Sequence, residues 1–202
     1  LSLCLYGAAG TGKTAYVRHL AESLGMDVLQ KRASDLLSKW IGETEQAIAG
    51  AFEEARASGK FLVFEEADSF LRDRSGATHS WEVTRVNEML TWMEVHDLPF
   101  ACTTNLVDSL DSASLRRFTF KIKFDFLTEK QVRLAFVHYF AIEPNSDICS
   151  LNNLTPGDFS VVKNKALIMG LAESRDQLTQ MLREETKMKG GLKGQIGFIA
   201  QN

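Results

Sequence analysis

The chain has 202 residues and a formal net charge of −3 at pH 7, so it can bury a sizeable core and lacks the overall basic character typical of nucleic-acid-binding proteins. It contains no apolar stretch of the roughly 20 residues that a membrane span needs, no charged-then-apolar leader, and three cysteines without metal-ligand or pairwise spacing. We therefore expect a soluble, cytoplasmic protein from a reducing compartment, with no membrane segment and no nucleic-acid partner.

The first motif is GAAGTGKT, which fits the pattern G-x-x-x-x-G-K-[ST] of a loop that wraps the phosphates of ATP or GTP. The apolar run before it predicts a buried strand, and the apolar spacing after it predicts a helix whose positive dipole end faces the same anion. We expect Lys13 to reach the β- and γ-phosphates and the Thr14 hydroxyl to bind Mg²⁺. The predicted nucleotide-binding residues are Gly7, Ala8, Ala9, Gly10, Thr11, Gly12, Lys13 and Thr14.

The next informative segment is SKWIGETE, at residues 38–45. Because charged residues and a glycine flank Trp40, we expect its ring to lie on the surface. Trp92, by contrast, has apolar neighbours at helical spacing and is predicted to be a core residue. Residues 44–57 have the pattern of an amphipathic helix.

Residues 61–64 form a continuous apolar run, which predicts a strand covered on both faces in a parallel sheet. Glu65 and Glu66 follow directly, at the edge where open α/β sheets bind ligands. Because a phosphate loop precedes this strand, we expect Glu65 to support Mg²⁺ and Glu66 to act as the general base toward the attacking water. A solvated glutamate pair that ends a strand is the alternative interpretation.

Together, GAAGTGKT and FLVFEEAD (residues 61–68) resemble the Walker A and Walker B motifs of the AAA family of ATPases, which implies ATP and Mg²⁺ as cofactors. Glu65 stands where the family has Asp; the extra methylene moves the carboxylate by ~1 Å, whereas Mg²⁺ requires near-ideal octahedral geometry. We therefore expect shifted or water-mediated metal support. Ala8 and Ala9 replace two prolines of the family motif, which should loosen the loop.

SKWIGETE resembles the pore loop of the classical clade, and is most similar to that of the branch with katanin, spastin and the vacuolar-sorting ATPases. The resemblance implies a ring, a homohexamer in this family, in which Lys39, Trp40 and Ile41 contact a polypeptide substrate. A tryptophan on a loop can grip extended chains of any sequence through their side chains.

Two later segments also resemble the family. Residues 99–105, PFACTTN, are similar to the sensor-1 strand, which implies that Asn105 orients the attacking water; an Asn that begins a turn is the alternative. DSASLRRF, at 111–118, resembles the arginine-finger segment. This implies that Arg117, preferred over Arg116, reaches the nucleotide of a neighbouring subunit, although paired arginines are often only surface charges.

The C-terminal part has helical patterns after a capping box at residues 128–131. We expect an α/β, parallel-sheet P-loop NTPase lobe over 1–125, a small all-helical lid over 126–188 and a flexible, glycine-rich tail over 189–202. The turn TPGDF resembles the start of the family's lid helix. This implies nucleotide contact, mainly through backbone, near Gly157 and Asp158.

The favoured function is an ATP-driven protein remodeller. A weakly active nucleotide-binding scaffold or regulatory subunit is the alternative, because Glu65 replaces the usual Asp. A nucleic-acid motor is a third interpretation; the negative net charge and the resemblance around Trp40 to a pore loop argue against it. Because the chain enters its first strand at Leu1, we expect a fragment whose N-terminal part is missing.

Overall fold

The computed structural model describes residues 1–38, 40, 42–72, 80–171 and 174–191. The chain divides into two compact units, Leu1–Phe124 and Asp125–Asn202. The division lies next to the point where the sequence pattern changes from strand to helix.

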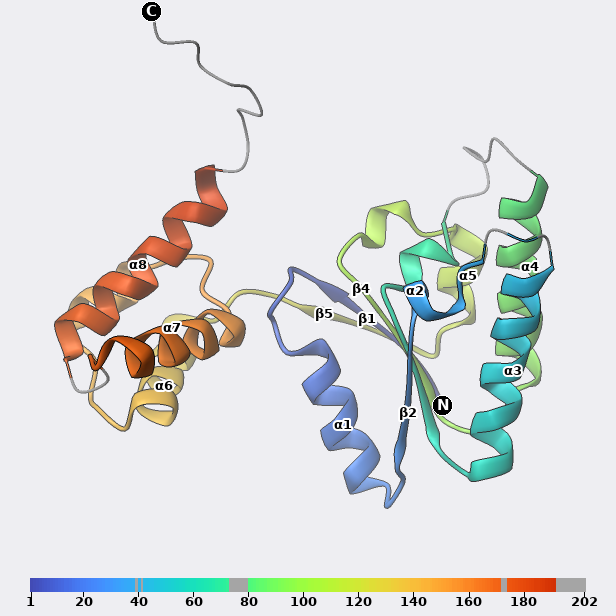
Figure 1. Ribbon diagram of the computed structural model, residues 1–202, viewed down its shortest axis with the longest axis horizontal. Helices are drawn as coiled ribbons and strands as arrows, with labels where there is room; N and C mark the ends of the chain where they lie inside the picture. Colours follow the sequence, from blue (N-terminus) through green and yellow to red (C-terminus); the bar gives the residue numbers. More distant parts are fainter. Residues whose placement is uncertain (39, 41, 73–79, 172–173, 192–202) are drawn as a thin grey trace, which may run out of the picture. The chain divides into compact units, whose positions relative to one another are not determined.

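The first unit is built on a parallel sheet (Figure 1). Among the described residues this sheet has five strands, in the order β2-β3-β4-β1-β5, and each neighbouring pair is parallel. The strands are β1 (Ser2–Gly7), β2 (Val28–Arg32), β3 (Phe61–Glu65), β4 (Phe100–Thr104) and β5 (Phe120–Phe124). This architecture confirms the predicted fold class, a parallel-sheet α/β lobe.

Helices cover both faces of the sheet, as Figure 1 shows. Alternate strand residues point to opposite faces, so β1 and β3 can be apolar throughout. On one face, Leu3, Leu5 and Val63 pack against α1 (Lys13–Ser23). The opposite face packs against α3 (Glu43–Ser58) and α4 (Ser80–Val95). The short elements of this unit are α2 (Ala33–Leu36), η1 (Ala67–Ser69), η3 (Val107–Ser109) and α5 (Ser112–Arg117).

The strand order determines which loops meet. Strand β4 lies between β1 and β3. The carboxyl ends of these three parallel strands are therefore neighbours at one edge of the sheet, which is the edge where open α/β sheets bind ligands. The segments that follow them are the phosphate loop, Asn105 and the pair Glu65 and Glu66.

The second unit is helical in its described part. Its elements are α6 (Glu129–Phe140), η4 (Ser146–Ser150), α7 (Pro156–Met169) and α8 (Arg175–Gly191). Its core has Phe136 and Phe159 at the centre, both fully buried. Thr128 forms the predicted capping box with Gln131 at the start of α6. Among the residues that the structure describes in both units, every helix is too short or too polar to span a bilayer.

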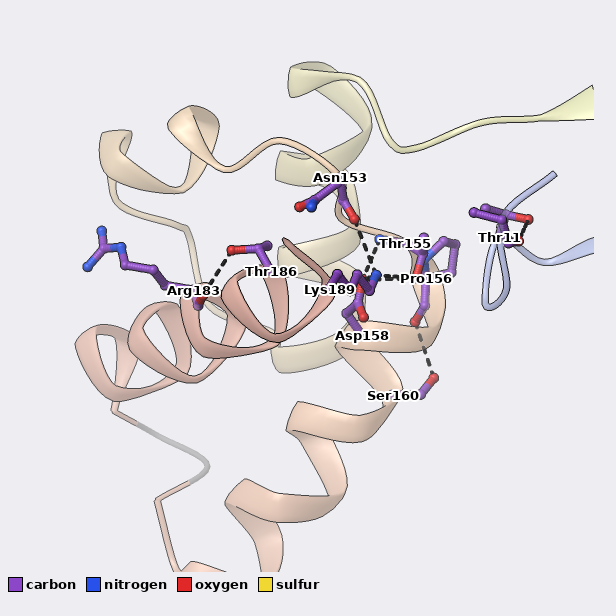
Figure 2. Close-up of polar contacts among 10 residues, drawn as sticks. Thr11, Asn153, Thr155, Pro156, Asp158, Ser160, Arg183, Thr186 and Lys189 are labelled. Atoms are coloured by element: carbon purple, nitrogen blue, oxygen red, sulfur yellow. Dashed lines mark hydrogen bonds and ion pairs between the residues drawn. The ribbon is translucent and has the colours of Figure 1, made fainter. Parts of the chain in front are cut away.

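Helix α8 continues further than its sequence indicates. The flexible tail was expected from residue 189, whereas α8 includes Lys189 and ends at Gly191. The Lys189 ammonium group lies 2.5 Å from a carboxylate oxygen of Asp158 and donates to the backbone oxygen of Asn153 at 3.2 Å (Figure 2). This ion pair ties the end of α8 to the start of α7. Residues 192–202 of the expected tail lie outside the described part of the chain.

Candidate functional site

The phosphate loop joins β1 to α1 and depends on a close backbone contact at its first residue. Gly7 has φ +136°, and a Cβ added there would lie 1.9 Å from the carbonyl oxygen of Phe124, its neighbour in β5. Only glycine fits at this position. Within the loop, the Thr11 hydroxyl donates to the carbonyl oxygen of Ala8 at 2.7 Å (Figure 2). The loop is therefore a compact turn held by its own side chain.

Lys13, at the start of α1, is the cation of the site. The residue is buried, with a relative exposure of 8%. Nζ donates to the carbonyl oxygens of Gly7 and Ala8 at 2.8 and 2.9 Å, and to Oδ1 of Asn105 at 2.7 Å. Burial lowers the pKa of the Lys13 ammonium group. The structure thus brings Asn105, from the end of β4, directly to the phosphate-loop lysine.

Thr14 and Glu65 come together although they are far apart in the chain. The Thr14 hydroxyl donates to Oε1 of Glu65 at 2.6 Å. The other oxygen, Oε2, accepts a hydrogen bond from Nε2 of Gln30 at 2.7 Å and lies 3.4 Å from Nε of Arg32. The two side chains expected to support Mg²⁺ therefore already share one hydrogen bond.

Glu66 differs from Glu65 in exposure and backbone conformation. It lies in solvent and adopts the left-handed conformation, φ +57°. For a residue with a Cβ this conformation costs about 1 kcal/mol. Within the described residues, no hydrogen bond or ion pair involves its carboxylate. The chain thus turns sharply at the end of β3 and leaves this carboxylate free.

Asp68 connects the ends of two strands. The Thr104 hydroxyl donates to Oδ1 of Asp68 at 2.7 Å and accepts the backbone N–H of Leu106 at 2.9 Å. Asn105 lies between Thr104 and Leu106 in the chain, so these two hydrogen bonds hold the loop that carries it. Sequence analysis missed Asp68 and Thr104, and the only signal in the sequence was an acidic residue close after the two glutamates.

The two arginines of α5 lie in different environments. Arg117 donates through Nε to Oε1 of Glu94 at 2.8 Å and through Nη1 to the carbonyl oxygen of Ala113 at 3.2 Å. Arg116 is exposed, and no side chain in the described part of the protein pairs with it. The sequence favoured Arg117, but its guanidinium group is engaged within its own subunit, so Arg116 is the better candidate for a contact in trans.

The segment expected to line a pore is described only in part, because Lys39 and Ile41 lie outside the described residues. Trp40 is 73% exposed, and its backbone N–H donates to Oγ of Ser38 at 3.1 Å. Ser38 in turn donates its backbone N–H to the buried hydroxyl of Thr44 in α3. The expected surface position of Trp40 is what the structure has.

In the second unit, one oxygen of the Asp158 carboxylate, Oδ2, takes part in three interactions. It accepts the backbone N–H of Thr155 at 2.7 Å and the Thr155 hydroxyl at 2.9 Å, in addition to its ion pair with Lys189 (Figure 2). Gly157 is in the first turn of α7 beside it. Through Oδ2 the carboxylate stabilises the start of α7.

Comparison with known proteins agrees with this geometry. A family model described as "ATPase family associated with various cellular activities (AAA)" matches residues 3–126. The chain is 29% identical to the 26S proteasome regulatory subunit 6B homolog of Encephalitozoon cuniculi over 202 aligned residues, which cover 92% of this chain and 52% of that protein.

For two further relatives, the alignment with this chain spans a smaller share of the relative's length. The chain is 30% identical to the proteasome-associated ATPase of Acidimicrobium ferrooxidans, over 77% of this chain and 31% of the relative. It is 31% identical to the Arabidopsis thaliana protein named suppressor of K(+) transport growth defect 1, over 80% of this chain and 37% of the relative. The chain thus spans about half or less of these curated relatives. The matched residues contain the phosphate loop, Glu65, Glu66, Asn105 and both arginines of α5, and the chain belongs to the AAA family of ATPases.

Proposed function

We propose that this chain binds ATP with Mg²⁺ at the carboxyl ends of β1, β3 and β4 and hydrolyses it. The observation that carries the proposal is the convergence of two hydrogen-bonded pairs, Lys13 with Asn105 and Thr14 with Glu65, from three adjacent strand ends. Family membership supports ATP over other nucleotides.

The residues have distinct roles in this proposal. Backbone N–H groups of the phosphate loop and the Lys13 ammonium group bind the phosphates, because both are donors at a helix N-terminus. Lys13 exchanges its bonds to carbonyl oxygens for stronger, charge-assisted bonds to phosphate oxygens. Asn105, released from Lys13, orients the attacking water and donates to the γ-phosphate.

The donor atoms fit Mg²⁺, which prefers oxygen ligands and usually takes only one or two from protein. Thr14 and Glu65 supply a hydroxyl and a carboxylate oxygen 2.6 Å apart. In the described residues, no group of three or more His, Cys, Asp or Glu side chains could hold a metal ion, so phosphates and water would complete the coordination. When bound, Mg²⁺ neutralises charge that develops on the phosphate oxygens.

Glu66 is proposed to accept the proton of the attacking water. Its carboxylate is exposed and unpaired among the described residues, so it remains a free acceptor. Arg116 is proposed to reach the nucleotide of a neighbouring copy, because it is exposed and unpaired where Arg117 is bound to Glu94. This revises the preference for Arg117. Any nucleotide contact from the turn at Gly157 is proposed to use mainly backbone groups, because Oδ2 of Asp158 is bound to Thr155 and Lys189.

We further propose that the whole protein is a homohexameric ring that remodels polypeptide substrates. Support comes from the family, from relatives named as a proteasome regulatory subunit and a proteasome-associated ATPase, and from the exposed Trp40 ring. A cytoplasmic location is proposed because all three cysteines are free thiols, the form that a reducing compartment maintains.

Two variants test the enzymatic proposal by steady-state ATPase assays and by binding of a fluorescent ATP analogue. Glu66→Gln should bind the analogue within twofold of the wild-type affinity and lose at least about 100-fold in turnover, because it removes the base but not the phosphate ligands. Lys13→Ala should lose binding itself. Fast hydrolysis by Glu66→Gln would exclude the proposed role of Glu66.

A second candidate function, a nucleotide-binding subunit with little hydrolysis, is favoured by the partners of Glu65. Its carboxylate is held by three side chains where the family has a shorter Asp. In that case the wild-type chain would bind the analogue but show negligible turnover, and Glu65→Asp would raise turnover steeply. The same two assays therefore separate the two candidates.

A further inference from the structure

The two oxygens of the Glu65 carboxylate have different partners. Among the described residues, Oε1 accepts a hydrogen bond only from the Thr14 hydroxyl, at 2.6 Å. Oε2 faces β2, where it accepts from Gln30 at 2.7 Å and lies 3.4 Å from the Arg32 guanidinium group. One oxygen therefore lies on the nucleotide side, and the other is anchored in the sheet.

The pairing of β2 with β3 brings Gln30 to Glu65. Arg32 lies opposite Glu65 and Gln30 lies opposite Val63, so both β2 residues point to the same face as the glutamate. Nη2 of Arg18, in α1, donates to Oε1 of Gln30 at 2.8 Å. Because the amide oxygen is bound by Arg18, the amide nitrogen must face Glu65.

The anchoring matters because this position carries Glu and not Asp. A glutamate has one more rotatable bond, and holding it in one geometry costs more conformational entropy. A fixed amide donor on one oxygen limits the positions of the other oxygen. Arg32 contributes less, because its side chain is 65% exposed and an ion pair in solvent is weak.

We propose that Gln30 is a positioning residue that holds the Glu65 carboxylate so that Oε1 alone supports the metal ion next to Thr14. The inference rests on the proposed binding of ATP with Mg²⁺. Gln30 does not touch the nucleotide in this mechanism. By holding the longer side chain of Glu65 in place, Gln30 allows a glutamate to support the metal ion where the family has an aspartate.

The experiment measures binding of a fluorescent ATP analogue at a series of Mg²⁺ concentrations and in EDTA. Gln30→Met keeps the volume of the side chain and removes the donor. We expect the Mg²⁺ concentration for half-maximal binding to rise about 10-fold, as is typical when a residue behind a metal ligand is lost. Binding in EDTA should stay unchanged, because the phosphate contacts do not involve Gln30.

Lys31→Met is the matched control. Lys31 is the next residue of β2, points to the opposite face and pairs with Glu54 of α3 at 2.7 Å. It should leave the Mg²⁺ dependence unchanged. A double-mutant cycle adds a second check: in a Glu65→Asp background the shorter side chain no longer reaches Gln30, so Gln30→Met should have no further effect.

The outcomes are distinguishable. If the wild-type chain binds no nucleotide, the proposed function and this inference both fail. If it binds with a Mg²⁺ dependence that Gln30→Met does not change, while thermal unfolding shows the variant to be folded, only the positioning role is overturned. An equal effect of Gln30→Met in the Glu65→Asp background would also overturn it.

Discussion

The functional groups of the site fall into an inner and an outer region. The inner groups each bind another part of the same subunit, and they are Lys13, Thr14, Glu65 and Asn105. The outer groups are exposed, their own side chains make no hydrogen bond or ion pair among the described residues, and they are Trp40, Glu66 and Arg116. The inner region is thus organised within one chain, whereas the outer side chains are open to a ligand, and under the proposed function they contact a nucleotide, a substrate or a neighbouring copy.

The largest effect that we expect is that of replacing Arg116, which tests whether this outer residue acts on the nucleotide of a neighbouring copy. Arg116→Ala should lower kcat by about 1,000-fold, because a guanidinium group that stabilises the transferring phosphoryl in trans contributes that much or more. ATP affinity should change little. Steady-state kinetics over a range of protein concentrations measures both.

Arg117→Ala is the control for Arg116. It should leave most of the turnover intact, since it breaks a partly exposed ion pair with Glu94 and a hydrogen bond to the Ala113 carbonyl oxygen, both away from the nucleotide in the proposed mechanism. Mixing inactive Arg116→Ala with inactive Glu66→Gln should restore part of the activity, because an Arg116→Ala copy keeps its base and can receive the intact arginine of a Glu66→Gln neighbour, whereas the reverse pairing lacks both groups. No recovery in a mixture that does assemble would argue against a site shared between subunits.

The next effect concerns the backbone contact that the inner region requires. Gly7→Ala should lower the free energy of unfolding by about 3 kcal/mol or more, because the new Cβ would lie 1.9 Å from the Phe124 carbonyl oxygen at an unfavourable φ. Gly12→Ala is the matched case: its φ is +95° but no atom lies within 4 Å, so we expect a loss of about 1 kcal/mol. Denaturant unfolding compares the two, and equal losses would contradict the steric argument.

Acid can disturb the core at the amino end of β4 without changing any site residue. His96 is buried against Phe52 and Phe100, and neither ring nitrogen has a hydrogen-bond partner in the part of the chain that the structure describes. Burial, followed by the charge of Arg56, lowers its pKa below 6.5. The unfolded chain therefore takes up a proton first as the pH falls, so the stabilising effect of the neutral ring is complete above pH 6.5 and is lost below it.

Stability should therefore fall with pH below that point, with a slope of at most about 1.4 kcal/mol per pH unit, the limit for one proton. His96→Leu should flatten this dependence in urea unfolding measured between pH 5 and 7.5, while substitution of the exposed His19 should not. An unchanged slope in His96→Leu would assign the acid sensitivity to another group.

Local patterns in the sequence predicted much of the fold and most of the inner region. The phosphate loop, its strand and its helix are contiguous, so their spacing is visible without any tertiary contact. The same holds for the apolar run before Glu65. Asn105 required the family resemblance, because an asparagine after a strand is also a common turn residue.

The remaining features depend on contacts between residues distant in the chain. The link from Gln30 to Glu65 requires the register of β2 on β3, and the pairing of Arg117 with Glu94 requires the packing of α5 on α4. Composition predicted a tail from Lys189 because glycines follow it, but its ion pair with Asp158 extends α8. Periodicity carries no information about such partners.

The smallest expected effect tests how firmly the Asn105 loop is held. Thr104→Val removes the hydroxyl that binds Asp68 and accepts the Leu106 N–H, so it should lower the free energy of unfolding by about 1 kcal/mol. Because the loop carrying Asn105 loses its anchor, turnover should fall more than ATP affinity. Thr103→Val is the control, since among the described residues the Thr103 hydroxyl has no hydrogen-bond partner. If the two variants behave alike, Asp68 does not position the loop, and Asn105 must be held by Lys13 alone.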